Sequence, residues 1–127
     1  MHEIFTYGTL MDPDIMTAVA GAGHRQSRAT LHNFRRLKVK NADFPGIIPA
    51  TGFSVQGILY SGISDADLRR LDAFEGEMYQ RRKLEAELPS AKKTAVFAYV
   101  IKESFRHLLD DKDWDFEHFL RHKSEFI

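Results

Sequence analysis

Strand-like segments dominate this chain, and helices do not alternate with them in a regular way. Apolar and β-branched residues recur at strand-like intervals in five stretches, which are residues 4–7, 26–40, 54–60, 79–88 and 94–101. Because regular βαβ alternation is missing, we expect an α+β fold, a small and mainly antiparallel β-barrel with flanking helices. A chain of 127 residues can bury one core, so we expect a single domain over residues 1–127.

Proline and glycine residues predict the first helix and one close backbone contact. Asp12-Pro13-Asp14 predicts a helix start, because proline suits the first helical turn and Asp12 can cap it. The helix then continues through residues 15–19, and Gly21 and Gly23 end it. Gly57 lies inside a predicted strand, which indicates a bulge or a close approach by another backbone.

Two further segments have patterns of their own. Residues 41–49 contain two prolines and a glycine, which predicts a loop with a brief extended segment that contributes to the walls of a pocket. The tail from residue 113 carries Phe116, Phe119 and Leu120 on one helical face. This pattern predicts an amphipathic helix packed over the sheet.

Charge and hydropathy limit the kinds of partner. The 18 basic and 18 acidic residues balance, so no global field attracts nucleic acid or an anionic membrane. Residues 33–40 alternate basic and apolar side chains, which favours a solvated strand face over a nucleic-acid patch. No window is long and apolar enough to span a bilayer. We expect neither nucleic acid nor membrane as a partner, and we expect a monomer or a weak homodimer.

The chain contains no cysteine, which excludes disulfides, thiolate zinc sites and a cysteine nucleophile. Residues 1–5 lack the basic segment and apolar run of a signal peptide. Both features are compatible with the cytoplasm, where we expect the protein to act. His118 and His122 stand four apart on the tail helix, but a solvated helix face is the favoured interpretation. We therefore expect no metal and no cofactor.

The segment that starts at Ser64 predicts a helix with both of its ends. Ser64 followed by Asp67 resembles a capping box at the start, and Gly76 supplies a stop at the end. The helix is therefore expected to cover residues 65–75.

Glu75 lies on the apolar side of this helix. At about 100° per residue, with Leu68 at zero, Leu71 falls at about −60° and Glu75 at about −20°. A glutamate directed at the core is costly unless it is paired, protonated or functional. Burial and the negative end of the helix dipole both raise its pKa, which suits proton transfer near neutral pH. Two other interpretations remain open, in which Glu75 bends toward solvent or pairs with Arg81 or Arg82.

The turn Tyr7-Gly8-Thr9-Leu10, directly after the first strand, is a second candidate for function. Gly8 permits a sharp turn and a close approach by a ligand to the peptide groups. Consecutive backbone N–H groups in such a turn can hold a carboxylate or a developing oxyanion. An ordinary strand-ending turn is the alternative, and the chain lacks the glycine-rich nucleotide-binding motifs.

Three segments carry a resemblance to a known family. They are residues 5–10 (FTYGTL), 55–60 (VQGILY) and 71–81 (LDAFEGEMYQR). In this order and spacing they resemble the γ-glutamyl cyclotransferase superfamily, specifically its AIG2-like and γ-glutamylamine cyclotransferase-like branch. The resemblance extends to about residue 100 and includes little of the tail helix.

The resemblance implies a β-barrel with a pocket at its mouth and assigns roles to residues. It implies that Tyr7-Gly8-Thr9-Leu10 binds the substrate and that Glu75 is the catalytic acid/base. Tyr79 matches a family tyrosine near the pocket and joins the expected substrate-binding set. Glu77 is a rival carboxylate, but it follows the helix-ending glycine and fits the family position less well.

The implied activity is that of a γ-glutamyl cyclotransferase, which acts by intramolecular aminolysis. The γ-glutamyl group of a small γ-glutamyl amine or peptide closes to 5-oxoproline, and the amine or amino acid is released. One alternative is a non-catalytic module that binds a small ligand at the same barrel mouth, because a fold does not fix a reaction. Another is an enzyme that cyclises a γ-glutamyl-like group on an intermediate or a carrier. Glu75 favours an enzyme, since a pure binder has little use for an unpaired inward carboxylate.

Overall fold

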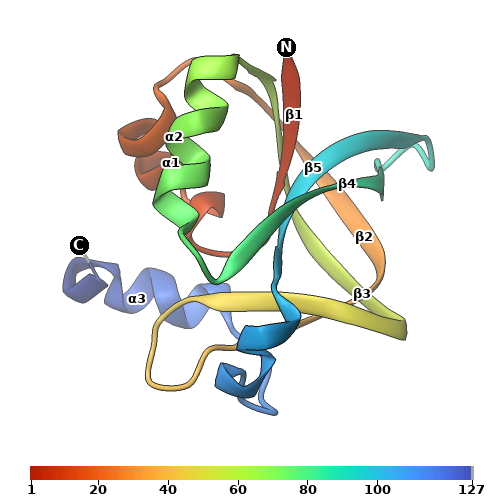
Figure 1. Cartoon of the computed structure of the whole chain (residues 1–127). Helices are drawn as coiled ribbons and strands as arrows, with labels where there is room; N and C mark the ends of the chain where they lie inside the picture. Colours follow the sequence, from red (N-terminus) through yellow and green to blue (C-terminus); the bar gives the residue numbers. More distant parts are fainter. Residues whose placement is uncertain (127) are drawn as a thin grey trace.

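The computed structural model describes the backbone of residues 1–126 and the side chains of residues 1–123. Figure 1 shows the elements along the chain. In order they are β1 (His2–Thr6), the 3-10 turn η1 (Thr9–Met11), α1 (Pro13–Ala20), β2 (Arg25–Lys38), β3 (Pro45–Ile63), α2 (Asp65–Glu75), β4 (Tyr79–Glu87), β5 (Lys93–Ile101), the 3-10 turn η2 (Glu103–Leu108) and α3 (Phe116–Phe126).

The strands close into a barrel in the order β1-β3-β2-β4-β5. Neighbouring strands run antiparallel, except that β1 and β5 pair in parallel through Ile4 and Phe97. Helices α1 and α2 lie side by side on one side of the barrel (Figure 1). The predicted α+β class, a mainly antiparallel barrel with flanking helices, is confirmed.

Strands β1, β3, β4 and β5 contribute side chains to two apolar layers, whereas β2 contributes to one of them. In β1, Phe5 belongs to the cluster that fills the barrel, whereas Ile4 belongs to the cluster that includes α1 and α2. In β5, Val100 belongs to the cluster that fills the barrel, and Ile101 belongs to the cluster that includes α1 and α2. This division follows from the alternation of side chains along a strand. Residues of both clusters meet at the end of β1, which is where the site lies.

Helix α2 has the predicted bounds, Asp65–Glu75. The Ser64 hydroxyl accepts a hydrogen bond from the Asp67 N–H at 3.1 Å. Gly76 ends the helix at a φ of 79°, a conformation that favours glycine. The last residue of the helix is Glu75, on the side that carries the buried leucines.

The residues predicted to start α1 also form ion pairs with α3. Asp12 accepts a hydrogen bond from the Asp14 N–H at 3.1 Å and is buried. Lys123 of α3 donates to the carboxylates of Asp12, at 2.7 Å, and Asp14, at 3.0 Å. Phe119 is buried as predicted, but Leu120 remains 37% exposed. The buried face is therefore narrower than the pattern predicted, and the Lys123 ion pairs connect the helix to the start of α1.

The loop predicted at residues 41–49 is confirmed for residues 41–44, but the brief extended segment predicted within it is the start of a long strand. Strand β3 begins at Pro45, and it pairs with β2 from Pro45 onward. Both prolines are compatible with strand β3, because neither interrupts its hydrogen-bonded ladder with β2. Pro45 is the first residue of the strand, and Pro49 borders the register shift between His32 and Phe34.

Gly57 lets β3 lie close to the end of β1. A Cβ atom at this position would lie 2.1 Å from the carbonyl oxygen of Thr6. The alternative of a bulge at Gly57 is wrong, since the register of β2 and β3 shifts between His32 and Phe34 instead. The contact fixes the end of β1, and with it the turn that follows.

Candidate active site

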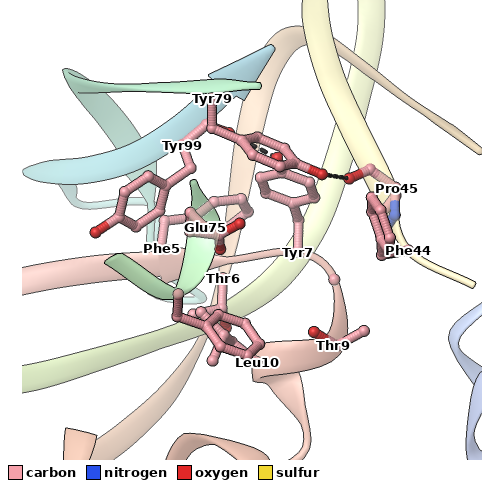
Figure 2. A pocket seen from close by; sticks show the side chains of 12 residues that line it. Phe5, Thr6, Tyr7, Thr9, Leu10, Phe44, Pro45, Glu75, Tyr79 and Tyr99 are labelled. Carbon is pink, nitrogen blue, oxygen red and sulfur yellow. Dashed lines mark hydrogen bonds between the residues drawn. The ribbon is translucent and has the colours of Figure 1, made fainter. Parts of the chain in front are cut away.

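A cavity of about 200 Å³ lies at the end of β1. Figure 2 shows its walls, which come from the turn after β1, the end of α2, the start of β3, and strands β4 and β5. The cavity brings together all the predicted site residues, from Tyr7-Gly8-Thr9-Leu10 to Glu75 and Tyr79. The other lining residues are Phe5, Thr6, Phe44, Pro45, Phe74 and Tyr99.

Glu75 is the acidic residue of the cavity. Among the side chains of residues 1–123, none forms a hydrogen bond or an ion pair with its carboxylate. Burial raises the pKa of Glu75 to about 8. The side chain is only partly buried in terms of surface, because it faces the cavity (Figure 2). A carboxyl group with this pKa exchanges protons near neutral pH.

Arg81, one of the two arginines predicted as possible partners of Glu75, forms a different ion pair. Arg81 Nε lies 3.0 Å from Asp72 Oδ1, so the predicted alternative of an Arg81–Glu75 pair is wrong. Asp72 also accepts a hydrogen bond from the Tyr99 hydroxyl at 2.7 Å. Asp72 lies at the edge of the apolar stripe of α2 and therefore reaches the half-exposed Arg81, whereas Glu75 points further inward. Among the side chains of residues 1–123, Glu75 is left without a counter-ion.

Three tyrosine hydroxyls around Glu75 donate to acceptors of the protein itself. Tyr7 donates to the Tyr99 carbonyl at 2.6 Å, and Tyr79 donates to the Pro45 carbonyl at 2.7 Å. Tyr99 donates to Asp72. Burial is the main cause that raises the pKa of each hydroxyl well above its usual range. The tyrosine hydroxyls therefore stay protonated and neutral. Glu75 is the side chain of the cavity that can exchange protons near neutral pH.

The turn at residues 7–10 is held on two sides. A Cβ atom on Gly8 would lie 2.9 Å from Pro45 Cδ, so glycine is needed for this contact. Arg36 donates to the Tyr7 carbonyl at 2.9 Å. The Met11 N–H donates to the Gly8 carbonyl at 3.0 Å and closes η1. The turn is thus fixed before any ligand arrives.

Polar groups of this turn are available to a ligand. The first N–H groups of a helical turn have no partner within it. No side chain of the described part of the chain caps them in η1. The hydroxyl of Thr9, which lines the cavity, has no hydrogen-bond partner in residues 1–123. The turn therefore offers donors at the same cavity as Glu75.

Sequence reasoning missed some residues that shape the site. Tyr99 lies in a buried strand, where alternation predicts only which face a side chain takes. Arg36 was grouped with a solvated strand face, yet it is half-buried and bonds to the Tyr7 carbonyl. Its guanidinium lies 5.5 Å from the centre of the Trp114 ring, and burial lowers its pKa. Phe44 and Pro45 were expected to form a wall of the pocket, and they line the cavity.

Tyr79→Phe is expected to reduce stability by about 1–2 kcal/mol while kcat for a reactive substrate changes less than threefold. The change removes the hydrogen bond to the Pro45 carbonyl and leaves that buried acceptor unpaired. The ring, which lines the cavity, remains. Urea unfolding and steady-state kinetics measure both effects. A large loss of kcat with unchanged stability would show instead that the hydroxyl acts on the substrate.

The stability of the wild-type protein is expected to fall as the pH rises from about 4.5 to about 8. In this window the native state retains the Glu75 proton, since burial raises the pKa to about 8, and the unfolded state has lost it. The free energy of unfolding therefore falls by at most about 1.4 kcal/mol per pH unit, relative to a variant without the carboxyl. Urea unfolding of wild type and Glu75→Gln between pH 5 and 8 tests this. Parallel pH curves for the two proteins would contradict it.

Neither a metal centre nor a membrane helix is found in the described residues. No group of three or more histidine, cysteine or acidic side chains there is arranged to hold a metal ion. His118 and His122 lie with ring centroids 4.5 Å apart, without a further ligand. No helix in the same part of the chain is both long and apolar enough to cross a bilayer.

The barrel and its flanking helices define the γ-glutamyl cyclotransferase-like class of folds. The chain belongs to the family described as "Gamma-glutamyl cyclotransferase, AIG2-like", whose model matches residues 4–116. The match includes every lining residue of the cavity.

Relatives agree with this assignment in sequence and in structure. AIG2-like protein D of Arabidopsis thaliana is 35% identical over 123 residues, which cover 92% of this chain and 78% of the relative. The solution structure of another Arabidopsis thaliana protein is 30% identical, with a TM-score of 0.78 over 99% of this chain and 85% of that one. The crystal structure of an AIG2-like protein from Mus musculus is 25% identical, with a TM-score of 0.69 over 91% of this chain and 88% of that one.

Proposed function

We propose that this protein is a γ-glutamyl cyclotransferase with Glu75 as its general acid/base. Its substrate is a small γ-glutamyl amine or peptide, and its products are 5-oxoproline and the released amine or amino acid. The observation that carries the proposal is Glu75 itself, an unpaired carboxyl group with a pKa of about 8 in a cavity that faces the Tyr7-Gly8-Thr9-Leu10 turn. The family assignment supports the reaction class.

The reaction needs two proton movements and no redox step. The α-amino nitrogen of the substrate attacks its own γ-carbonyl carbon, and the new C–N bond closes a five-membered lactam. The original amide C–N bond then breaks. Two protons pass from the attacking nitrogen to the departing nitrogen through Glu75, which returns to its starting state. Because the attack is intramolecular, correct orientation supplies much of the catalysis.

The raised pKa of Glu75 suits the first of these proton movements. An α-amino group titrates at about 8 and an ordinary glutamate at about 4.3, a mismatch of about 5 kcal/mol for proton transfer. Burial raises the pKa of Glu75 to about 8 and so removes most of the mismatch. The same carboxyl, once protonated, can then donate to the departing nitrogen.

The turn after β1 and the size of the cavity suit the glutamyl part of such a substrate. The N–H groups of η1 and the Thr9 hydroxyl are donors for its α-carboxylate or for the oxyanion of the tetrahedral intermediate. The cavity, at about 200 Å³, is smaller than the ~300–1,000 Å³ of sites for drug-sized ligands. It therefore suits a group of amino-acid size whose remainder extends outside.

Release of 5-oxoproline from a panel of γ-glutamyl amines and dipeptides tests the proposal. We expect kcat/KM to follow a bell-shaped pH profile with both limbs near pH 8. The reactive pair is ionised Glu75, with a pKa of about 8, and the substrate's ammonium form, which titrates at about 8 as well. A flat profile between pH 6 and 10 would contradict the role of Glu75. Binding of γ-glutamyl compounds without any 5-oxoproline would identify a binding module instead.

A further inference from the structure

Asp72 and Glu75 lie one turn apart on α2 and differ in their charged partners. Asp72 Oδ1 lies 3.0 Å from Arg81 Nε of β4. Glu75 lines the cavity and has no ion-pair partner among the side chains of residues 1–123. Because residues three apart are neighbours on a helix surface, the guanidinium of Arg81 approaches a face of α2 that carries both carboxylates, and it binds Asp72.

The strands beside α2 place Arg81 close to the site. Side chains two apart on a strand share a face, so Arg81 lies on the same face of β4 as Tyr79, which lines the cavity. The hydroxyl of Tyr99, from the neighbouring strand β5, donates to Asp72 at 2.7 Å. The charges of Glu75 and Arg81 both act on this hydroxyl, and they shift its pKa in opposite directions. Glu75 and Arg81 are therefore both neighbours of the same hydroxyl.

We propose that Asp72 is a positioning residue for the reaction, because it holds Arg81 beside Tyr99 and so keeps this cation from pairing with Glu75. The proposal rests on the proposed function, in which Glu75 takes up a proton from the α-amino nitrogen of the substrate. A guanidinium beside Glu75 would stabilise the ionised carboxylate and lower its pKa. The carboxylate would then be a weaker base, and its mismatch with an α-amino group would return. Asp72 does not line the cavity, so it acts through Arg81.

The other groups that face Glu75 do not supply a cation. The titratable groups around it are the hydroxyls of Tyr7 from the turn after β1, Tyr79 from β4 and Tyr99 from β5 (Figure 2). All three are neutral, because burial raises the pKa of each well above its usual range. None of the residues that line the cavity in the described part of the chain is basic. Arg36 of β2 is held at the carbonyl of the turn after β1. The position of Arg81 therefore decides whether Glu75 has a counter-ion.

The pKa of Glu75 in Asp72→Asn tests the proposal without any substrate. Carbon-13 NMR follows the side-chain carboxyl carbon of Glu75 during a pH titration, and Glu75→Gln identifies its signal. The amide oxygen of the new side chain can still accept the hydrogen bond from Tyr99, but the negative charge that holds Arg81 is lost. We expect the pKa of Glu75 to fall by about 1 unit or more, the usual effect of an adjacent arginine on a carboxyl group. An unchanged pKa would overturn the proposal.

The double variant Asp72→Asn/Arg81→Gln is the matched control, because loss of the Asp72 charge can itself lower the pKa of Glu75. Both variants lack that negative charge, but the double variant has no guanidinium that could move to Glu75. We expect its Glu75 pKa to lie within about 0.5 unit of the wild-type value. A fall of equal size in the single and the double variant would assign the effect to the lost charge of Asp72 and overturn the role of Arg81.

The pH profile of kcat/KM connects this titration with the reaction. In Asp72→Asn we expect the acid limb for 5-oxoproline release to move to lower pH by the shift in the Glu75 pKa, about 1 unit or more. The other limb, set by the substrate's ammonium group, stays at about pH 8. A merely structural role of Asp72 would lower the rate without moving the limb. An unmoved acid limb would overturn the inference, while turnover by the wild-type protein would keep the proposed function intact. If the wild-type protein releases no 5-oxoproline, the proposed function fails, and the role of Asp72 in the reaction fails with it.

Discussion

Glu75→Gln is expected to lower kcat for 5-oxoproline release by about 10²–10⁴-fold, the usual contribution of a general acid/base. The amide has nearly the same shape as the carboxyl, but it cannot accept a proton from the attacking nitrogen or return one to the departing nitrogen. The buried position of Glu75 tolerates a neutral side chain, since burial already favours the uncharged form. Single-turnover assays at pH 8 with a reactive γ-glutamyl amine measure the loss directly.

Glu77→Gln is the matched control for this experiment. Glu77 lies two residues further along the chain, beyond the helix-ending Gly76, and it is exposed and outside the cavity. We expect its replacement to change kcat less than twofold. Circular dichroism and thermal unfolding of both variants establish that they are folded. An active Glu75→Gln variant beside an inactive Glu77→Gln variant would move the acid/base to the rival carboxylate.

Gly57→Ala is expected to lower the free energy of unfolding by about 3 kcal/mol, the upper part of the range for overpacking in a core. The added Cβ would lie 2.1 Å from the backbone oxygen of Thr6 and 2.8 Å from Phe5 Cζ. A methyl group has no rotamer that relieves such a contact, so β1 and β3 must separate locally. Because Thr6 directly precedes the turn that we propose to bind substrate, the surviving folded protein is also expected to bind substrate less well.

Urea unfolding measures this change, with Gln56→Ala as the control on the same strand. Gln56 is exposed and adjacent to Gly57, so its truncation tests whether shortening a β3 side chain is costly in itself. We expect Gln56→Ala to change the free energy of unfolding by less than about 0.5 kcal/mol. Similar values for the two variants would show that β1 can move away from Gly57 at little cost.

The features that were predicted correctly from sequence depend on short-range chemistry. The bounds of α2 follow from Ser64 at one end and Gly76 at the other. The inward direction of Glu75 follows from helical geometry once those bounds are known. The first half of β3 was missed for a related reason, since Pro45 and Pro49 are loop signals when only neighbouring residues are considered. Pairing with β2 overrides those signals, and pairing depends on residues distant in sequence.

The electrostatic partners in the site depend on tertiary structure in the same way. Sequence left Arg81 free to pair with Glu75, and only the arrangement of β4 against α2 directs it to Asp72. Tyr99 comes to the cavity from β5, so no local pattern assigns it to the site. The family resemblance identified the catalytic candidates, whereas the other walls of the cavity became evident only from the barrel.

The parallel pairing of β1 with β5 has a consequence for how the site is assembled during folding. The Tyr7 hydroxyl donates a hydrogen bond to the carbonyl of Tyr99, which is 92 positions away in sequence, next to the β1–β5 pairing. Closing so long a segment of chain costs more entropy than forming the β4–β5 hairpin, so this pairing is expected to form late. The turn at residues 7–10 follows β1 directly, and we therefore expect it to reach its place in the cavity with Glu75 only when the barrel closes. In a refolding experiment, the appearance of 5-oxoproline would report the final step of folding rather than the formation of the individual strands.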